Sequence, residues 1–219
     1  MKRALFALGV LALVSLACSA LNSSPAATQA PALPGKQVLF QDNFSDSNSG
    51  WPSATDADKS ANYSADGQYA IQAITTQQDV WAHPGQNFAD ASVEVDATKT
   101  NGPDNNGFGV ICRFQDNDNF YYFMISSDGY QVIGKYQGGQ NQYLSAEKMQ
   151  PTDAITAGNA TNHVRGDCQG STLTLYANGQ QLSSITDTTF TSGDVGLIVG
   201  TFDEPNVGVS FDNFVVYQP

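Results

Sequence analysis

The chain has 219 residues, of which 21 are acidic and 9 basic, and its formal net charge at pH 7 is −12. This excess of negative charge argues against nucleic acid as a partner, because phosphate backbones are bound by basic surfaces. Eighteen of the acids are Asp and three are Glu. Asp favours turns and caps whereas Glu favours helices, so the sequence predicts many loops and few helices.

The first twenty residues, "MKRALFALGVLALVSLACSA", place two basic residues before the apolar run Ala4 to Ala17. This run is shorter than the roughly 20 residues of a membrane-spanning helix and predicts a signal peptide over residues 1–17. Cys18 follows directly. It is either incidental or, as we expect, the lipidated residue of a lipobox, since "SLAC" resembles that of bacterial lipoproteins although Leu16 lies one place late. The protein would then be extracytoplasmic and anchored to a bacterial membrane at the cell surface.

After Cys18 the text "SALNSSPAATQAPALPG" has neither charge nor periodicity. We interpret residues 18–35 as the lipidated cysteine followed by a flexible tether of Ser, Ala and Pro. Residues 36–219 are enough for a single domain with a sizeable core. Without Lys2 and Arg3, 7 basic residues face 21 acidic ones, so the mature chain would carry a charge of about −14.

The remaining sequence consists of short alternating runs bounded by Gly, Asn, Asp and Pro. They predict strands near 37–44, 61–64, 68–73, 78–82, 91–99, 107–115, 119–126, 129–136, 140–144, 161–168, 171–177, 180–184, 194–201 and 207–217. Asp66-Gly67, Asp128-Gly129 and Asn178-Gly179 each predict a two-residue hairpin turn. So many short strands predict an all-β fold, a sandwich of two antiparallel sheets.

The hairpin "FYYFMISSDGYQVIGKY" over 120–136 raises the question of which face meets a ligand. A two-residue turn would pair Tyr121 with Tyr136 on an uncharged face that we assign to the core. The opposite face would carry Tyr122 across from Lys135, with Arg113 one strand earlier. This second face is either ordinary solvated sheet or the floor of a binding site.

Four segments carry a family resemblance: "LFQDNFSDSNSGWP", "GFGVICRFQDNDNFYYFMISSDGYQVIGKY", "CQGSTLTLYANGQQL" and "VGLIVGTFDEPNVGVSFDNFVVY". Together they resemble the concanavalin A-like lectin/glucanase superfamily, and more narrowly the laminin-G-like and keto-disaccharide-hydrolase-like domains of bacterial surface lipoproteins. The resemblance covers 37–217 and implies a jelly roll with its first and last strands adjacent.

The resemblance also implies that glycans bind on the concave sheet. Sugars stack on flat aromatic rings beside a few polar groups that fix their orientation. We therefore take Tyr122, Arg113 and Lys135 as candidate ligand-binding residues. Trp81, in "DVWAHPG", is a fourth candidate, with a purely structural role as the alternative.

Lectin-like jelly rolls often carry a structural Ca²⁺ where the first and last strands meet, and hard Ca²⁺ takes oxygen ligands. The resemblance places Asp42 and Asp212 there as candidate metal ligands. The alternative is that both carboxylates merely cap strand ends or accept backbone N–H groups.

With Cys18 set aside, Cys112 and Cys168 remain. Outside the cytoplasm such a pair most simply forms one disulfide. The loop it would close is worth roughly 4 kcal/mol on the chain-entropy model.

The sequence contains no familiar catalytic motif. Retaining glycosidases of the superfamily place two Glu on one strand, whereas Glu94, Glu147 and Glu204 are scattered singly. We therefore expect a non-catalytic carbohydrate-binding domain. The alternatives are a structural or adhesive surface protein that binds a protein partner or its own copies and, with less support, a glycoside-acting hydrolase.

Overall fold

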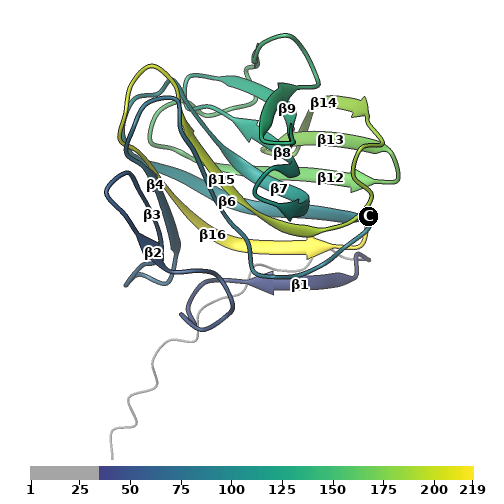
Figure 1. Ribbon diagram of the computed structural model, residues 1–219, viewed down its shortest axis with the longest axis horizontal. Helices are drawn as coiled ribbons and strands as arrows, with labels where there is room; N and C mark the ends of the chain where they lie inside the picture. The colour runs from purple at the N-terminus through teal and green to yellow at the C-terminus, as the bar shows by residue number, and fades with distance from the viewer. Residues whose placement is uncertain (1–34) are drawn as a thin grey trace, which may run out of the picture.

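The computed structural model describes residues 35–219 as two stacked sheets (Figure 1). That range contains sixteen strands and no helix, and therefore no helix able to cross a membrane. The predicted signal peptide, Cys18 and the tether as far as residue 34 lie outside the described residues. The prediction of an all-β sandwich of two antiparallel sheets is confirmed.

The larger sheet has nine strands in the order β14-β13-β12-β6-β16-β4-β3-β2, with β1 paired to β16. Its strands are β1 (Val38–Asp42), β2 (Ala54–Thr55), β3 (Lys59–Tyr63), β4 (Tyr69–Ala73), β6 (Ala91–Asn101), β12 (Thr161–Gln169), β13 (Thr172–Ala177), β14 (Gln180–Thr186) and β16 (Val207–Tyr217). The first and last strands lie side by side, as predicted, with Asp42 opposite Phe214.

The smaller sheet has seven strands in the order β10-β9-β8-β7-β15-β5, with β11 paired to β9. Its strands are β5 (Asp79–Ala82), β7 (Asn106–Asp116), β8 (Asn119–Ile125), β9 (Tyr130–Gln137), β10 (Gln140–Tyr143), β11 (Gln150–Pro151) and β15 (Asp194–Thr201). All fourteen predicted strands coincide with observed ones to within two residues, and only the two-residue strands β2 and β11 were not predicted.

The core lies between the sheets, where alternate residues of each strand point inward. In β6, Val93, Val95 and Ala97 are fully buried there. The predicted disulfide between Cys112 and Cys168 is present and joins β7 to β12, with the two Cα atoms 6.7 Å apart. It therefore links one sheet to the other through the core.

The hairpin between β8 and β9 differs from its prediction by one residue. Its loop has three residues, because the Ser126 N–H donates to the Tyr130 carbonyl and closes the loop. The Gly129 N–H donates to the Ser126 carbonyl within it. Gly129 supplies the positive φ that such a loop requires. Tyr122 consequently lies opposite Gly134, not Lys135. The Asp66-Gly67 turn also has a three-residue loop, whereas Asn178-Gly179 forms the two-residue turn as predicted.

The register shift changes which side chains share a face. Tyr136 and Val132 join Tyr122 on the outer face of the smaller sheet, whereas Lys135 turns to the other side. The assignment of Tyr136 to the core face was therefore wrong. A one-residue slip has this effect because successive side chains of a strand alternate between faces.

Candidate functional site

The outer face of the smaller sheet carries its own hydrophobic cluster. Its buried members are Ile111, Phe114, Phe120, Tyr122, Met124, Val132 and Ile198, and Trp81, Tyr136, Tyr143 and Met149 pack against them. Gly134 makes room for this layer, since a Cβ there would collide with the Tyr122 ring. This face is therefore neither inner core nor ordinary solvated sheet.

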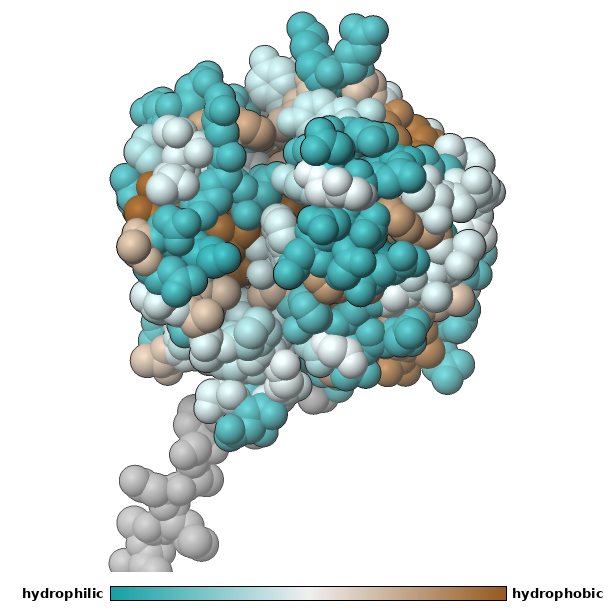
Figure 2. Space-filling view, in the orientation of Figure 1, coloured by the Kyte–Doolittle hydropathy of each residue, from teal (hydrophilic) through white to brown (hydrophobic). Residues whose placement is uncertain are grey.

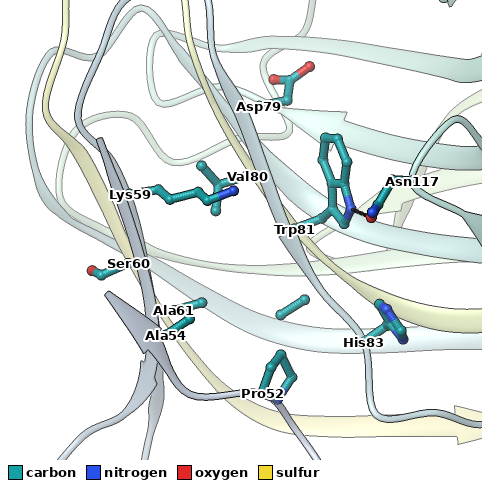
Figure 3. Close-up of a pocket in the computed structure, with 11 residues that line it drawn as sticks. Pro52, Ala54, Lys59, Ser60, Ala61, Asp79, Val80, Trp81, His83 and Asn117 are labelled. Carbon is teal, nitrogen blue, oxygen red and sulfur yellow. Dashed lines mark hydrogen bonds between the residues drawn. The ribbon is translucent and has the colours of Figure 1, made fainter. Parts of the chain in front are cut away.

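Trp81 lies at one edge of this aromatic layer. Its ring centroid is 5.1 Å from that of Phe120 and 5.6 Å from that of Tyr136. The indole Nε1–H donates to Asn117 Oδ1 at 3.0 Å (Figure 3). Trp81 is held on two sides yet remains partly exposed, as a platform for an apolar ligand face must be.

Asp79 precedes Trp81 on the same face of β5. Its Oδ2 accepts a hydrogen bond from the Tyr136 hydroxyl at 2.6 Å. Burial raises the pKa of Asp79, and the Tyr136 hydrogen bond offsets this only in part. Burial and, to a lesser degree, the nearby Asp79 carboxylate raise the pKa of Tyr136. This phenol therefore stays protonated and donates.

A cavity of about 370 Å³ opens beside these residues, between the edge strand β5 of one sheet and β2 and β3 of the other. Its lining comprises Pro52, Ala54, Lys59, Ser60, Ala61, Asp79, Val80, Trp81, Ala82, His83 and Asn117. Figure 3 shows the Lys59 side chain extending from β3 toward Val80 of β5. In Figure 2 hydrophobic residues are visible between hydrophilic ones beside the part of the molecule formed by β2 to β4. The cavity combines one aromatic platform with charged and amide groups.

His83 separates this cavity from a neighbouring one of about 360 Å³ that it also lines. Its ring stacks on Phe114 with centroids 4.2 Å apart. Its Nδ1 lies 2.8 Å from Asp194 Oδ2. Asp194 is fixed in turn by N–H groups of Gly85, Gln86 and Val195, at 2.6, 2.7 and 2.8 Å. The imidazole is therefore held in one orientation, with Nδ1 occupied by the carboxylate.

Arg113 does not reach this face. It lies on a bulge of β7 with a φ of 52°, which turns its side chain away from the expected direction. The buried guanidinium donates to the carbonyls of Ala89, Phe190 and Gly170, at 2.9, 2.9 and 2.8 Å, and to Asp90 Oδ1 at 3.1 Å. The expectation that Arg113 projects beside Tyr122 was wrong, and its donors stabilise the loops that contain Ala89, Phe190 and Gly170.

Lys135 and Tyr122 are also engaged within the protein. Lys135 is buried and donates to Asp187 at 3.0 Å and Thr189 at 2.7 Å. Tyr122 is 1% exposed and its hydroxyl donates to Asn141 Oδ1 at 2.6 Å. Of the four predicted ligand-binding residues, Trp81 alone lines the cavity.

Both candidate calcium ligands accept hydrogen bonds from within the protein. Asp42 accepts hydrogen bonds from the Phe44 N–H and from Trp51 Nε1, at 2.7 and 3.0 Å, and a short one from Ser49. Asp212 accepts one from the Asn213 N–H. No group of three His, Cys, Asp or Glu side chains that could hold a metal occurs in residues 35–219. Calcium binding at Asp42 and Asp212 therefore stays a prediction, with both oxygens of Asp42 already accepting hydrogen bonds.

Sequence reasoning missed Asp79, Lys59 and Asn117. The alternation in "DVWAH" carried a usable signal, because it places Asp79, Trp81 and His83 on one face of an edge strand. No local pattern indicated Lys59 or Asn117, because the fold brings them to β5 from distant segments.

No protein-family model and no curated protein matches this chain. Among solved structures it is similar to a carbohydrate-binding module, CBM66, from Bacillus subtilis, with 19% identity and a TM-score of 0.61 over 77% of this chain and 96% of that one. It is also similar to a Bacillus licheniformis β-glucanase, with 15% identity and a TM-score of 0.58 over 82% and 97%. A third similar structure is a Bacillus subtilis protein with a galectin-like fold, with 12% identity and a TM-score of 0.58 over 84% of this chain and 98% of that one. The fold is thus a concanavalin A-like β-sandwich, as the resemblance implied.

Proposed function

We propose that this chain binds carbohydrate, without hydrolysing it, in the cavity beside Trp81 between the edge strand β5 of the smaller sheet and β2 and β3 of the larger sheet. The observation that carries the proposal is a partly exposed indole in a cavity of about 370 Å³ with Asp79, Lys59, His83 and Asn117 around it. The C–H face of a sugar would stack on the indole, and the polar groups would take its hydroxyls. The similarity in fold to a carbohydrate-binding module and a β-glucanase supports this choice.

Binding is favoured over hydrolysis by the acids at the site. Glycoside hydrolysis normally uses two carboxyl groups that flank the bond to be cleaved. Among the described residues, Asp79 is the one carboxyl in the lining of this cavity, and Tyr136 already occupies one of its oxygens. Asp194, in the neighbouring cavity, accepts three backbone N–H groups and contacts His83.

A glycan-array screen of the full-length protein in mild detergent, with calcium and again with EDTA, tests the proposal. We expect retention on a defined set of neutral glycans without release of reducing sugar. Reducing ends that disappear in Asp79→Asn would indicate a hydrolase instead. A blank array with folded protein would favour the structural or adhesive alternative, and self-association is then measured by sedimentation. Loss of binding in EDTA would support the predicted calcium site despite the poor fit of Asp42.

We further propose that the domain is lipid-anchored through Cys18 at a bacterial membrane, which the arrangement of the first twenty residues supports. A bacterium expressing the full chain and fed an alkyne fatty acid should label the protein. Cys18→Ser should abolish the label and release the protein from membranes. An unlabelled wild-type protein would point to an ordinary signal peptide.

A further inference from the structure

The outer face of the larger sheet carries an ion network. Asp96 and Glu94 of β6 face His163 of β12, with Nδ1–Oδ1 and Nε2–Oε2 distances of 2.8 and 3.3 Å. Arg165, two residues further along β12, binds Asp167 through Nε and Nη2, at 2.7 and 2.5 Å. Charges of opposite sign therefore lie across and along neighbouring strands.

A cavity of about 230 Å³ lies within this network, lined by Glu94, His163, Arg165, Tyr176 and Gly179. The Arg165 guanidinium carbon stands 4.3 Å from the centre of the Tyr176 ring, which fixes both side chains. At Gly179 an added Cβ would meet no atom within 4 Å, so this wall of the cavity is open. The cavity is smaller than the sites that hold drug-sized ligands and suits one compact ring.

Glu94 is the feature that points to a ligand. The residue is 6% exposed, yet its Oε1 has no hydrogen-bond partner among residues 35–219. The nearest cations, Arg165 Nε and Lys36 Nζ, are 3.7 and 3.8 Å away, beyond hydrogen-bond distance. Lys36 Nζ is likewise buried without a hydrogen-bond partner among residues 35–219. A buried carboxylate oxygen that lacks a donor is costly, so a donor from outside the protein would be bound favourably here.

The charges around the cavity indicate what that donor is. Three cations, Lys36, His163 and Arg165, stand beside the carboxylates Glu94, Asp96 and Asp167. Hydrogen bonds to Asp96 and Glu94 raise the pKa of His163 to about 9, so its charge is present at neutral pH. Charges of both signs surround the cavity, and either an ammonium or an anion would meet several groups of its own sign. A neutral hydroxyl donor meets no such opposition.

We propose that this cavity is a second binding site, for a single neutral sugar ring or a similar polyol, on the outer face of the larger sheet. One hydroxyl donates to Glu94 Oε1, and its neighbour accepts from Arg165 Nη1, which makes no hydrogen bond within residues 35–219. The ring lies beside Tyr176. The site is independent of the function proposed above, since it shares no residue with the Trp81 cavity.

Saturation-transfer NMR of the full-length protein with glucose, galactose, mannose and xylose tests the proposal. We expect signals for at least one sugar, with a Kd of about 1 mM as for a small, shallow site. Gly179→Asn should abolish them, because Asn tolerates the positive φ and its side chain extends from the open wall. Glu94→Gln, which replaces one carboxylate oxygen by an amide donor, should weaken binding about tenfold.

Gly170→Asn is the matched control. Gly170 also has a positive φ and free space around it, but it lies in the turn at the other end of β13. It should leave the signals unchanged, as should Trp81→Ala. Three results would overturn the proposal: no transfer to any of the four sugars in folded protein, undiminished binding in Gly179→Asn, or loss in Trp81→Ala alone. The first would mean a cavity that holds only water, and the last would place the sugar on the smaller sheet.

Discussion

On the outer face of the smaller sheet, Trp81, Phe120 and Tyr136 lie with ring centroids 4.9 to 5.6 Å apart. On the outer face of the larger sheet, Glu94 and Arg165 belong to a network of ions. The aromatic face is held by packing, whereas the ionic face is held by pairs open to solvent on one side. The comparison teaches that one sandwich can carry two unrelated surfaces, because each sheet needs only its inner face for the core.

Substitution of Tyr122 should have the largest effect, because the aromatic face depends on packing. Tyr122→Ala is expected to cost about 3–5 kcal/mol of unfolding free energy, as for other large buried aromatic residues. Tyr122→Phe, which removes only the hydrogen bond to Asn141, should cost about 1 kcal/mol. Urea unfolding measures both. Equal costs for the two variants would mean that the hydroxyl, and not the ring, stabilises this face.

Removing the covalent link between the sheets should rank next. Cys112→Ala with Cys168→Ala is expected to lower the unfolding free energy by about 2–4 kcal/mol. The chemical denaturation midpoint measures it, with the wild-type protein under reducing conditions as the comparison. An unchanged midpoint in both would show that the bridge adds nothing to packing of the two sheets.

On the ionic face, stability should depend on pH through His163. Its pKa rises from 6.5 to about 9 in the folded protein, chiefly through its hydrogen bonds to Asp96 and then Glu94. The stabilisation is therefore fully present below pH 6.5 and is lost as the pH rises through about 9. Urea midpoints from pH 6 to pH 10 should fall for the wild-type protein and fall less for His163→Gln. If the midpoints of the two proteins fall in parallel, His163 is not the source of the pH dependence.

Arg165→Ala should have the smallest effect. Its side chain is 26% exposed, and the lost pair with Asp167 and the stacking on Tyr176 together should cost about 0.5–1 kcal/mol. Tyr176→Leu, which keeps apolar contact but removes the aromatic ring, separates the two contributions. A loss as large as that for Tyr122→Ala would erase the contrast between the faces.

The strands could be predicted from the sequence because alternation and Gly-containing turns are local signals. The side chains that share one face of a sheet could not be predicted, because a loop or bulge that is one residue longer moves a side chain to the other face. An Asp-Gly pair fits both two-residue and three-residue loops, and the three-residue choice moved Tyr136 to the outer face and Lys135 away from it. The bulge at Arg113 likewise redirected a side chain with no cue from composition.

The candidate site was predictable only in part. Trp81 was proposed from its polar flanks and does line the cavity, and the disulfide followed from the presence of two remaining cysteines. The other residues around Trp81 were not predicted. Asp194 contacts His83 from 111 positions away in the sequence, and Lys59 belongs to the other sheet. Long-range juxtapositions of this kind leave no pattern in a single sequence.

The most direct measurement compares glycan binding by wild-type protein, Trp81→Ala and Tyr130→Ala on the same array. Tyr130 is a matched control, since it is 40% exposed on the smaller sheet and does not line the Trp81 cavity. We expect Trp81→Ala to weaken binding at least about tenfold while Tyr130→Ala binds as wild type. Unchanged binding by folded Trp81→Ala, or no binding by the wild-type protein, would contradict carbohydrate recognition at this cavity.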